Sequence, residues 1–146
     1  MKIVLVEPKI PPNTGTIARL CAANYIQLDL VGELGFSLDD SHLKRAGLDY
    51  WGEVNYEHFP DANAYMSSLN RDHSFLFTTK VHRPYTDASY TDNSVLIFGS
   101  ETEGLSDSIR TRFINDCCRL PMENPNVRSL NLSNAVAVVL YHAKYS

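Results

Sequence analysis

The sequence of 146 residues has no long apolar run and no excess of positive charge, and each absence excludes a class of protein. A membrane-spanning helix needs about 20 mostly apolar residues in a row, and no stretch of the chain provides them. The formal net charge of -4 argues against a general nucleic-acid coat protein, although it is compatible with a local basic patch. The apolar start is short and ends at Glu7 and Pro8, which is typical of a strand rather than a signal peptide. We therefore expect a cytoplasmic protein with no membrane partner.

Cysteine is also scarce. The three cysteines, Cys21, Cys117 and Cys118, form an odd set without paired spacing, so we predict buried free thiols and no disulfide framework. The five histidines are scattered singly, and neither CxxC nor HExxH occurs. We therefore predict no metal site.

Short apolar strands alternate with helices along the chain. Apolar runs and turn residues predict strands over residues 2–6, 28–31, 54–58, 74–78, 95–98 and 117–121. Helices are expected over residues 14–24, 43–46, 62–69, 105–113 and 131–144, the first of them capped by Asn13. Continuous apolar strands separated by helices predict one α/β domain over residues 1–146, a mostly parallel sheet with helices on both faces.

Three loops that join a predicted strand to a predicted helix are candidates for a binding site. They cover residues 7–13, 99–106 and 121–129. Ligands of open parallel sheets bind where loops leave the carboxyl ends of the strands. If the three strands are neighbours, we expect their loops to converge on one site.

The loop over residues 99–105 resembles a phosphate-binding loop only superficially. Gly104 is not followed by lysine and Ser or Thr, and no GxGxxG occurs. Glu101 and Glu103 make the loop a poor anion cradle and fit a ligand with cationic or hydroxyl groups better. A plain strand-to-helix turn is the alternative.

Two arginines lie beside these loops, and each has two interpretations. Arg19 lies about 200° around the first predicted helix from Ile17, off its apolar face, as a solvated residue would. It also follows a candidate site loop, and Glu101 of another loop is an available partner. Arg128 is either a solvated cation or a phosphate contact beside a helix start.

The last predicted helix begins among small polar residues and continues as an almost wholly apolar stretch. Ser129 and Asn131 at its start either cap the helix or bind a ligand, and the two roles are compatible. Residues 135–140 show no polar face, which requires cover on most sides. Packing within this helix is the default role of Tyr141 and His142.

Three ordered motifs match one known family, and a further segment, over residues 45–50, resembles one of its subgroups. They are P-x-I-P-x-N-T-G-x-I-x-R-x-C over residues 8–21, R-A-G-L-D-Y over 45–50, F-G-S-E-T-x-G-L over 98–105, and L-P-M over 120–122 with R-S-L-N-L-S-N-A-V over 128–136. Together they resemble the SPOUT-class RNA ribose 2′-O-methyltransferases. Within that class, the likeness is closest to the small single-domain tRNA (cytidine(34)-2′-O)-methyltransferase subgroup, and it covers essentially the whole chain.

That resemblance implies a C-terminal trefoil knot, the SPOUT or alpha-beta knot, in which S-adenosyl-L-methionine binds in a bent shape. The implied cofactor contacts are Phe77, Gly99, Gly104, Leu120, Met122, Ser129 and Leu130. It also implies a homodimer through the C-terminal helix, with residues 135–140 covered by the knot and the second subunit.

The implied reaction methylates the ribose 2′-hydroxyl of the wobble nucleotide of tRNA, a cytidine or modified uridine at position 34, and leaves S-adenosyl-L-homocysteine. Arg19 would activate or orient that hydroxyl, and Glu101 would hold Arg19 or take the proton. Asn13, Ser129 and Asn131 would support the site. The implied RNA contacts are Arg128, Arg45, Lys9 and Tyr141.

The chain departs from the subgroup at three positions. Ser100 and Glu103 stand where proline and arginine are common, and His142 stands where an acidic residue is common. Two alternative functions stay open. One is a catalytically inactive RNA- or nucleotide-binding module of the same fold, and the other is a flavodoxin-like nucleotide enzyme, which the missing phosphate-loop and Rossmann fingerprints disfavour.

Overall fold

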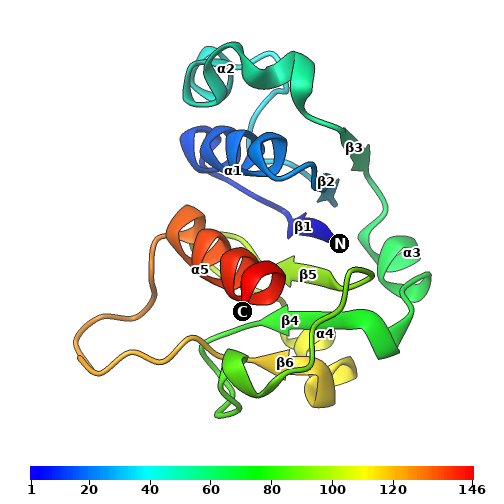
Figure 1. The fold of residues 1–146 in the computed structure, drawn as a ribbon, viewed down its shortest axis with the longest axis vertical. Coiled ribbons are helices and arrows are strands. Elements are labelled where there is room, and N and C mark those ends of the chain that lie inside the picture. Colours follow the sequence, from blue (N-terminus) through cyan, green and yellow to red (C-terminus); the bar gives the residue numbers. More distant parts are fainter.

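A six-stranded parallel sheet forms the centre of the protein in the computed structural model (Figure 1). The structure describes residues 1–146, except the side chains of residues 47–49. Its strands are β1 (Lys2–Val6), β2 (Gln27–Val31), β3 (Tyr56–Phe59), β4 (Ser74–Phe77), β5 (Val95–Phe98) and β6 (Cys117–Cys118). The sheet order is β3-β2-β1-β5-β4-β6, and neighbouring strands run parallel.

Helices cover both faces of this sheet, which confirms the predicted α/β class. The helices are α1 (Pro11–Ala23), α2 (Ser41–Gly47), α3 (Ala62–Ser67), α4 (Asp107–Arg112) and α5 (Leu132–Tyr145). Short 3-10 turns lie at η1 (Leu48–Glu53), η2 (Arg71–His73), η3 (Tyr85–Asp87) and η4 (Ile114–Asp116). Helices α1 and α5 lie on one face, with α2 against α1, while α3 and α4 lie on the other.

Strand β1 explains why the strands read as continuous apolar runs. Ile3 and Leu5 belong to the core beneath α1 and α5, whereas Val4 and Val6 belong to the core beneath α3. Successive side chains of a strand point to opposite faces, so a strand covered on both sides needs apolar residues at every position.

Helix α1 begins three residues earlier than predicted. Pro11 and Pro12 occupy its first positions, where proline fits because the amide groups there have no partner within the helix. The predicted cap at Asn13 is therefore wrong. Ile10 is the N-cap and makes no side-chain cap bond.

The predicted strands over residues 2–6 and 95–98 are present with the same ends, and the remaining predicted elements are present with shifted ends. The predicted strand over 117–121 is shortened to two residues, and after it the Arg119 amide donates to the carbonyl of Arg83, in a loop outside the named strands. The predicted motif over residues 45–50 includes residues 47–49, whose side chains lie outside the described residues.

Helices α1 and α5 lie side by side, and buried Asn24 joins their far ends. Its amide group donates to the carbonyl of Leu20 over 3.0 Å, and its side-chain oxygen accepts the Tyr145 hydroxyl over 2.8 Å. Lys144 Nζ donates to the Asn24 carbonyl over 2.7 Å. This junction fixes α5 along α1, although the two helices lie far apart in the sequence.

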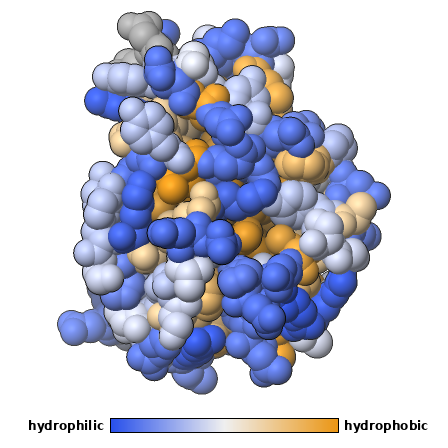
Figure 2. All heavy atoms as spheres, turned by 45° about the vertical axis from the view of Figure 1, so that its right-hand side comes forward, coloured by the Kyte–Doolittle hydropathy of each residue, from blue (hydrophilic) through white to orange (hydrophobic). Residues whose placement is uncertain are grey.

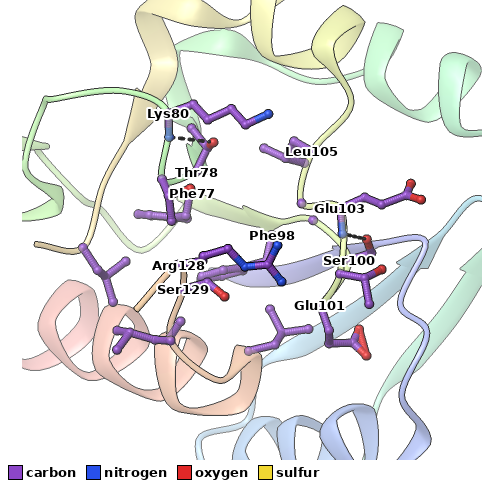
Figure 3. Close-up of a pocket in the computed structure, with 18 of the residues that line it drawn as sticks. Phe77, Thr78, Lys80, Phe98, Ser100, Glu101, Glu103, Leu105, Arg128 and Ser129 are labelled. Carbon is purple, nitrogen blue, oxygen red and sulfur yellow. Dashed lines mark hydrogen bonds between the residues drawn. The ribbon is translucent and has the colours of Figure 1, made fainter. Parts of the chain in front are cut away.

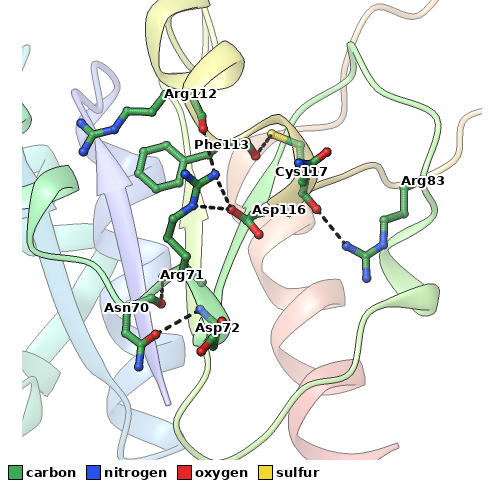
Figure 4. Close-up of polar contacts among 10 residues, drawn as sticks. Asn70, Arg71, Asp72, Arg83, Arg112, Phe113, Asp116 and Cys117 are labelled. Atoms are coloured by element: carbon green, nitrogen blue, oxygen red, sulfur yellow. Dashed lines mark hydrogen bonds and ion pairs between the residues drawn. The ribbon is translucent and has the colours of Figure 1, made fainter.

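The guanidinium group of Arg71 stabilises the turn that leads into the short edge strand β6 (Figure 4). Arg71, in the turn before β4, donates to Asp116 Oδ2 from Nε and Nη2 over 3.1 and 3.0 Å. Its Nη2 also donates to the carbonyl of Arg112 over 2.8 Å, and its guanidinium stacks on the buried ring of Phe113. These contacts tie the turn before β4 to the turn before β6.

The three cysteines are buried free thiols, as predicted. Burial raises the pKa of the Cys21 thiol to about 12 and is the largest cause that raises the pKa of Cys117 to about 11. Both thiols are protonated near neutral pH and are poor nucleophiles there. Among the described residues, no cluster of His, Cys, Asp or Glu side chains is arranged to hold a metal ion.

Hydrophilic side chains cover most of the face shown in Figure 2, and apolar residues show only in small patches between them. Within the described chain, no helix combines the length and the apolar character that crossing a membrane requires.

Candidate active site

A cavity of about 500 Å³ lies where β4 and β5 end (Figure 3). Two of the three candidate loops contribute to its lining, through residues 99–105 and the segment over residues 120–130, whereas the loop over residues 7–13 does not. The candidate loops follow β1, β5 and β6. These three strands are not all neighbours, because β4 lies between β5 and β6. The loop after β4 therefore adds Thr78, Thr79 and Lys80 to the cavity. Sequence reasoning missed the two threonines and considered Lys80 only as a candidate RNA contact. The available signal was a polar run directly after an apolar strand.

All seven residues that the resemblance assigned to the cofactor line this one cavity. They are Phe77, Gly99, Gly104, Leu120, Met122, Ser129 and Leu130. They come from three separate segments of the chain, so only the fold brings them together.

The cavity combines an apolar floor with a charged rim. The rings of Phe77 and Phe98 stack with centroids 4.8 Å apart and planes 18° from parallel, at the ends of adjacent strands. Charged residues from three segments surround them, namely Lys80, Glu101, Glu103 and Arg128. Figure 3 shows Arg128 extending from the segment before α5 toward the loop that carries Ser100. Such a lining suits a ligand that has a flat apolar ring and charged groups of both signs.

The loop over residues 99–104 is a tight turn that requires glycine at its start. A Cβ on Gly99 would lie 2.1 Å from the backbone carbon of Gly104, so no side chain fits there. Ser100 and Gly104 exchange two backbone hydrogen bonds of 3.3 and 3.0 Å, and Gly104 adopts a φ of +67°. The hydroxyl of Ser100 accepts a hydrogen bond from the Glu103 amide over 3.1 Å. Ser100, which stands where the subgroup commonly has proline, therefore stabilises the turn.

Glu101 joins this loop to the loop before α1. Its carboxylate accepts the backbone amide of Lys9 over 3.0 Å, and its second oxygen accepts the amide of Ile10. The described ion pairs do not include Glu101 with Arg19, although sequence reasoning offered that pair. The carboxylate therefore holds the start of α1 against the cavity loop.

Asn131 connects the starts of α1 and α5. Its amide nitrogen donates to Asn13 Oδ1 over 3.1 Å. Its oxygen accepts the amide of Asn134 over 3.2 Å and the hydroxyl of Ser133 over 2.5 Å, so it also caps α5. Both roles that the sequence allowed for Asn131 are thus present in one side chain, while Ser129 lines the cavity.

The other predicted site residues lie outside the cavity lining. Arg19 is exposed on α1, with its guanidinium carbon 5.1 Å from the centroid of the Tyr50 ring. Arg45 is exposed on α2, and Lys9 lies in the loop that Glu101 holds. Tyr141 lies in the second half of α5.

Comparison of the sequence with models of known protein families identifies the family of this chain. The model of the SpoU rRNA Methylase family matches residues 1–141. The chain belongs to this family. The resemblance read from its motifs is therefore confirmed.

Relatives of this SpoU family member match it over nearly their whole length. The tRNA (cytidine(34)-2′-O)-methyltransferase of Methylovorus glucosotrophus is 47% identical over 142 residues, which cover 97% of this chain and 92% of that protein. A solved structure from work on the 2-OH methylation of C/U34 on tRNA superposes with a TM-score of 0.90 at 38% identity, covering 97% of this chain and 92% of the other.

A more distant solved structure shares the fold of this SpoU family member. It is the SpoU methyltransferase AviRb of Streptomyces viridochromogenes in complex with the cofactor AdoMet, at 22% identity and a TM-score of 0.85. The superposition covers 98% of this chain and 56% of that protein.

Proposed function

We propose that this protein transfers a methyl group from S-adenosyl-L-methionine to the ribose 2′-hydroxyl of nucleotide 34 of tRNA, a cytidine or a modified uridine. The observation that carries this proposal is one cavity lined by the motifs over residues 98–105 and 120–136 together with the end of β4. Asn131 joins this site to Asn13 of the first motif. Relatives named for this reaction match nearly the whole chain, including every segment that lines the cavity. This similarity supports the same tRNA substrate for this protein.

The cavity fits S-adenosyl-L-methionine by volume and chemistry. About 500 Å³ lies within the range of small-molecule sites. The stacked rings of Phe77 and Phe98 suit an adenine, and Glu101 and Glu103 suit the positive sulfonium and ammonium groups. Arg128 and Lys80 suit the carboxylate. When bound, the cofactor supplies a methyl group that is already activated for transfer.

The protein's task is then to place a poor nucleophile and to manage its proton. Arg19 orients the 2′-hydroxyl or neutralises the neighbouring phosphate, since a guanidinium stays protonated near neutral pH and donates in a planar fork. Glu101 positions the start of α1, which carries Arg19, because both of its oxygens accept backbone amides. Ser129 and Asn131 fix the opposite wall of the site.

The C-terminal segment forms a trefoil knot in this proposal. Support comes from the sheet order, in which β6 is an edge strand while the following helix α5 returns to pack on α1 and β5. The chain must pass β4 between Cys118 and Leu132 to do so.

A homodimer through α5 completes the proposed assembly. The buried residues of α5 are Leu132, Val136, Val139 and Leu140, so part of its surface is covered within one chain. Val138, Tyr141 and Tyr145 remain 45%, 49% and 61% exposed. That uncovered apolar face supports a second copy as its partner.

RNA binding by an acidic chain requires a local patch, and Arg128, Arg45, Lys9 and Tyr141 are its proposed members. Because its substrate is tRNA, we place the protein in the cytoplasm.

Cofactor titration and methyl transfer test the function together. Calorimetry with S-adenosyl-L-methionine is expected to show binding, and labelled cofactor is expected to mark tRNA from cells that lack the modification. Binding without transfer to any tRNA indicates the inactive binding module. Absence of cofactor binding contradicts the proposed function.

A further inference from the structure

Arg19 lies against the ring of Tyr50, the last residue of the motif over residues 45–50, and the resemblance assigned this tyrosine no role. Its guanidinium carbon is 5.1 Å from the centroid of the Tyr50 ring, within the range of a cation–π contact. Tyr50 belongs to η1, whereas Arg19 belongs to α1, so the contact joins two elements of the fold.

The turn that carries Tyr50 is anchored to the body of the protein. Trp51, the next residue, is half-buried and packs against the main core. Its ring meets the Tyr56 ring edge-on, with centroids 5.5 Å apart and planes 83° apart. Helix α1 also packs against both α2 and η1. The Tyr50 ring is therefore presented to Arg19 from a fixed segment.

A ring holds a guanidinium differently from a carboxylate. A carboxylate occupies the N–H groups of arginine and neutralises its charge, whereas stacking uses the flat face and leaves the in-plane donors available. In the part of the chain with described side chains, the ion pairs do not include Arg19. Among the described side chains, the Tyr50 contact thus restricts the position of Arg19 without neutralising its charge.

We propose that Tyr50 is a positioning residue that holds the Arg19 guanidinium for the methylated ribose. This inference rests on the proposed function, in which Arg19 contacts the 2′-hydroxyl or its phosphate. Tyr50 is not among the residues that line the cavity, so its effect passes through Arg19.

Kinetics of three variants test the proposal. Tyr50→Leu keeps apolar bulk but removes the ring, and we expect kcat to fall about 3- to 5-fold, as loss of an exposed cation–π contact would give. The KM for tRNA, the cofactor affinity and the melting temperature are expected to stay near those of the parent. Tyr50→Phe keeps the ring face and should restore kcat. Tyr25→Leu, a change at a 97% exposed tyrosine on the α1–β2 turn, serves as the matched control with parental kcat.

Side-chain NMR gives a readout that does not depend on activity, and its first measurement uses the unsubstituted protein alone. The Arg19 δ-protons should show an upfield ring-current shift, retained in Tyr50→Phe and lost in Tyr50→Leu. Absence of that shift in the parent, or an unchanged kcat in Tyr50→Leu, overturns the proposal. A rise in the KM for tRNA with kcat unchanged also overturns it, and points instead to Tyr50 stacking on an RNA base.

The failure of this inference is separable from the failure of the proposed function. If Arg19→Ala transfers at the parental rate, the role given to Arg19 is wrong, and the role of Tyr50 falls with it. If Arg19→Ala loses transfer while Tyr50→Leu keeps it, only the inference about Tyr50 is wrong.

Discussion

Asn131 donates a hydrogen bond to Asn13 over 3.1 Å and so joins two motif residues that are 118 positions apart. The same side chain caps α5 through its oxygen. One amide therefore fixes both the direction of α5 and its distance from α1 at the edge of the cavity. The two functions of this side chain can be separated by substitution, because one needs an acceptor and the other needs a donor.

Asn131→Asp and Asn131→Ala are predicted to differ in stability more than in activity. Aspartate still accepts the Asn134 amide, so the free energy of unfolding should change little, whereas alanine should lose about 1 kcal/mol with the cap. Both variants lose the donor to Asn13, and we expect methyl transfer to fall about tenfold in each. Urea unfolding and initial rates check this pair. Equal stability of the two variants would contradict the capping role.

Gly99→Ala is predicted to weaken cofactor binding. Its Cβ would lie 2.1 Å from the Gly104 backbone, so the loop must move. Overpacking of about 1–3 kcal/mol corresponds to roughly a 5- to 150-fold loss of affinity when the strain falls on the cofactor site. Gly52→Ala, where an added Cβ has no neighbour within 4 Å, is the matched control. Calorimetry that finds parental affinity in Gly99→Ala would show that this loop does not shape the cofactor pocket.

Glu101→Gln separates a positioning role from a proton-accepting role. Glutamine keeps one acceptor for the Lys9 and Ile10 amides, so we expect partial transfer activity and a modest loss of stability. Removal of a general base costs about 100- to 10000-fold in rate. Rates of Glu101→Gln and Glu101→Ala, measured with tRNA and cofactor at saturation, decide between the two. If the rate of Glu101→Gln falls by about 100-fold or more, as for removal of a general base, this carboxylate is the group that takes the proton.

Stability is predicted to fall in alkali through the buried thiols. The pKa of Cys21 is raised from 9.0 to about 12 by burial, so between these values the unfolded chain loses a proton that the folded chain keeps. Stability contributed by this thiol is present below pH 9 and declines by about 1.4 kcal/mol per pH unit above it. Cys21→Ala should therefore give a shallower fall in melting temperature between pH 9 and pH 10.5. Parallel slopes for the parent and Cys21→Ala would contradict this assignment.

The sequence predicted local features better than the partners of individual residues. Apolar runs bounded by turn residues located β1 and β5 to the residue, because a strand covered on both faces leaves a continuous signal. Asn131 before an apolar helix likewise predicted a cap. Helix α1 was placed late because its prolines resembled a loop, although proline is favoured in the first turn of a helix.

The rest depended on tertiary structure. The insertion of β4 between β5 and β6 is a matter of sheet order, which no local pattern contains, and it added Lys80 to the cavity. The partners of Glu101 are backbone amides more than 90 positions away, so no residue type in the sequence pointed to them. The contact of Arg19 with Tyr50 depends in the same way on how η1 packs beside α1.

The most direct test of the central claim maps the methyl group on tRNA. The protein is incubated with labelled S-adenosyl-L-methionine and two synthetic tRNAs that differ only in a ribose or a 2′-deoxyribose at nucleotide 34. Nuclease digestion with mass spectrometry is predicted to find 2′-O-methylation at nucleotide 34 of the first tRNA and no transfer to the second. Equal transfer to both tRNAs, or a methyl group on a base or at another nucleotide, would contradict the claim.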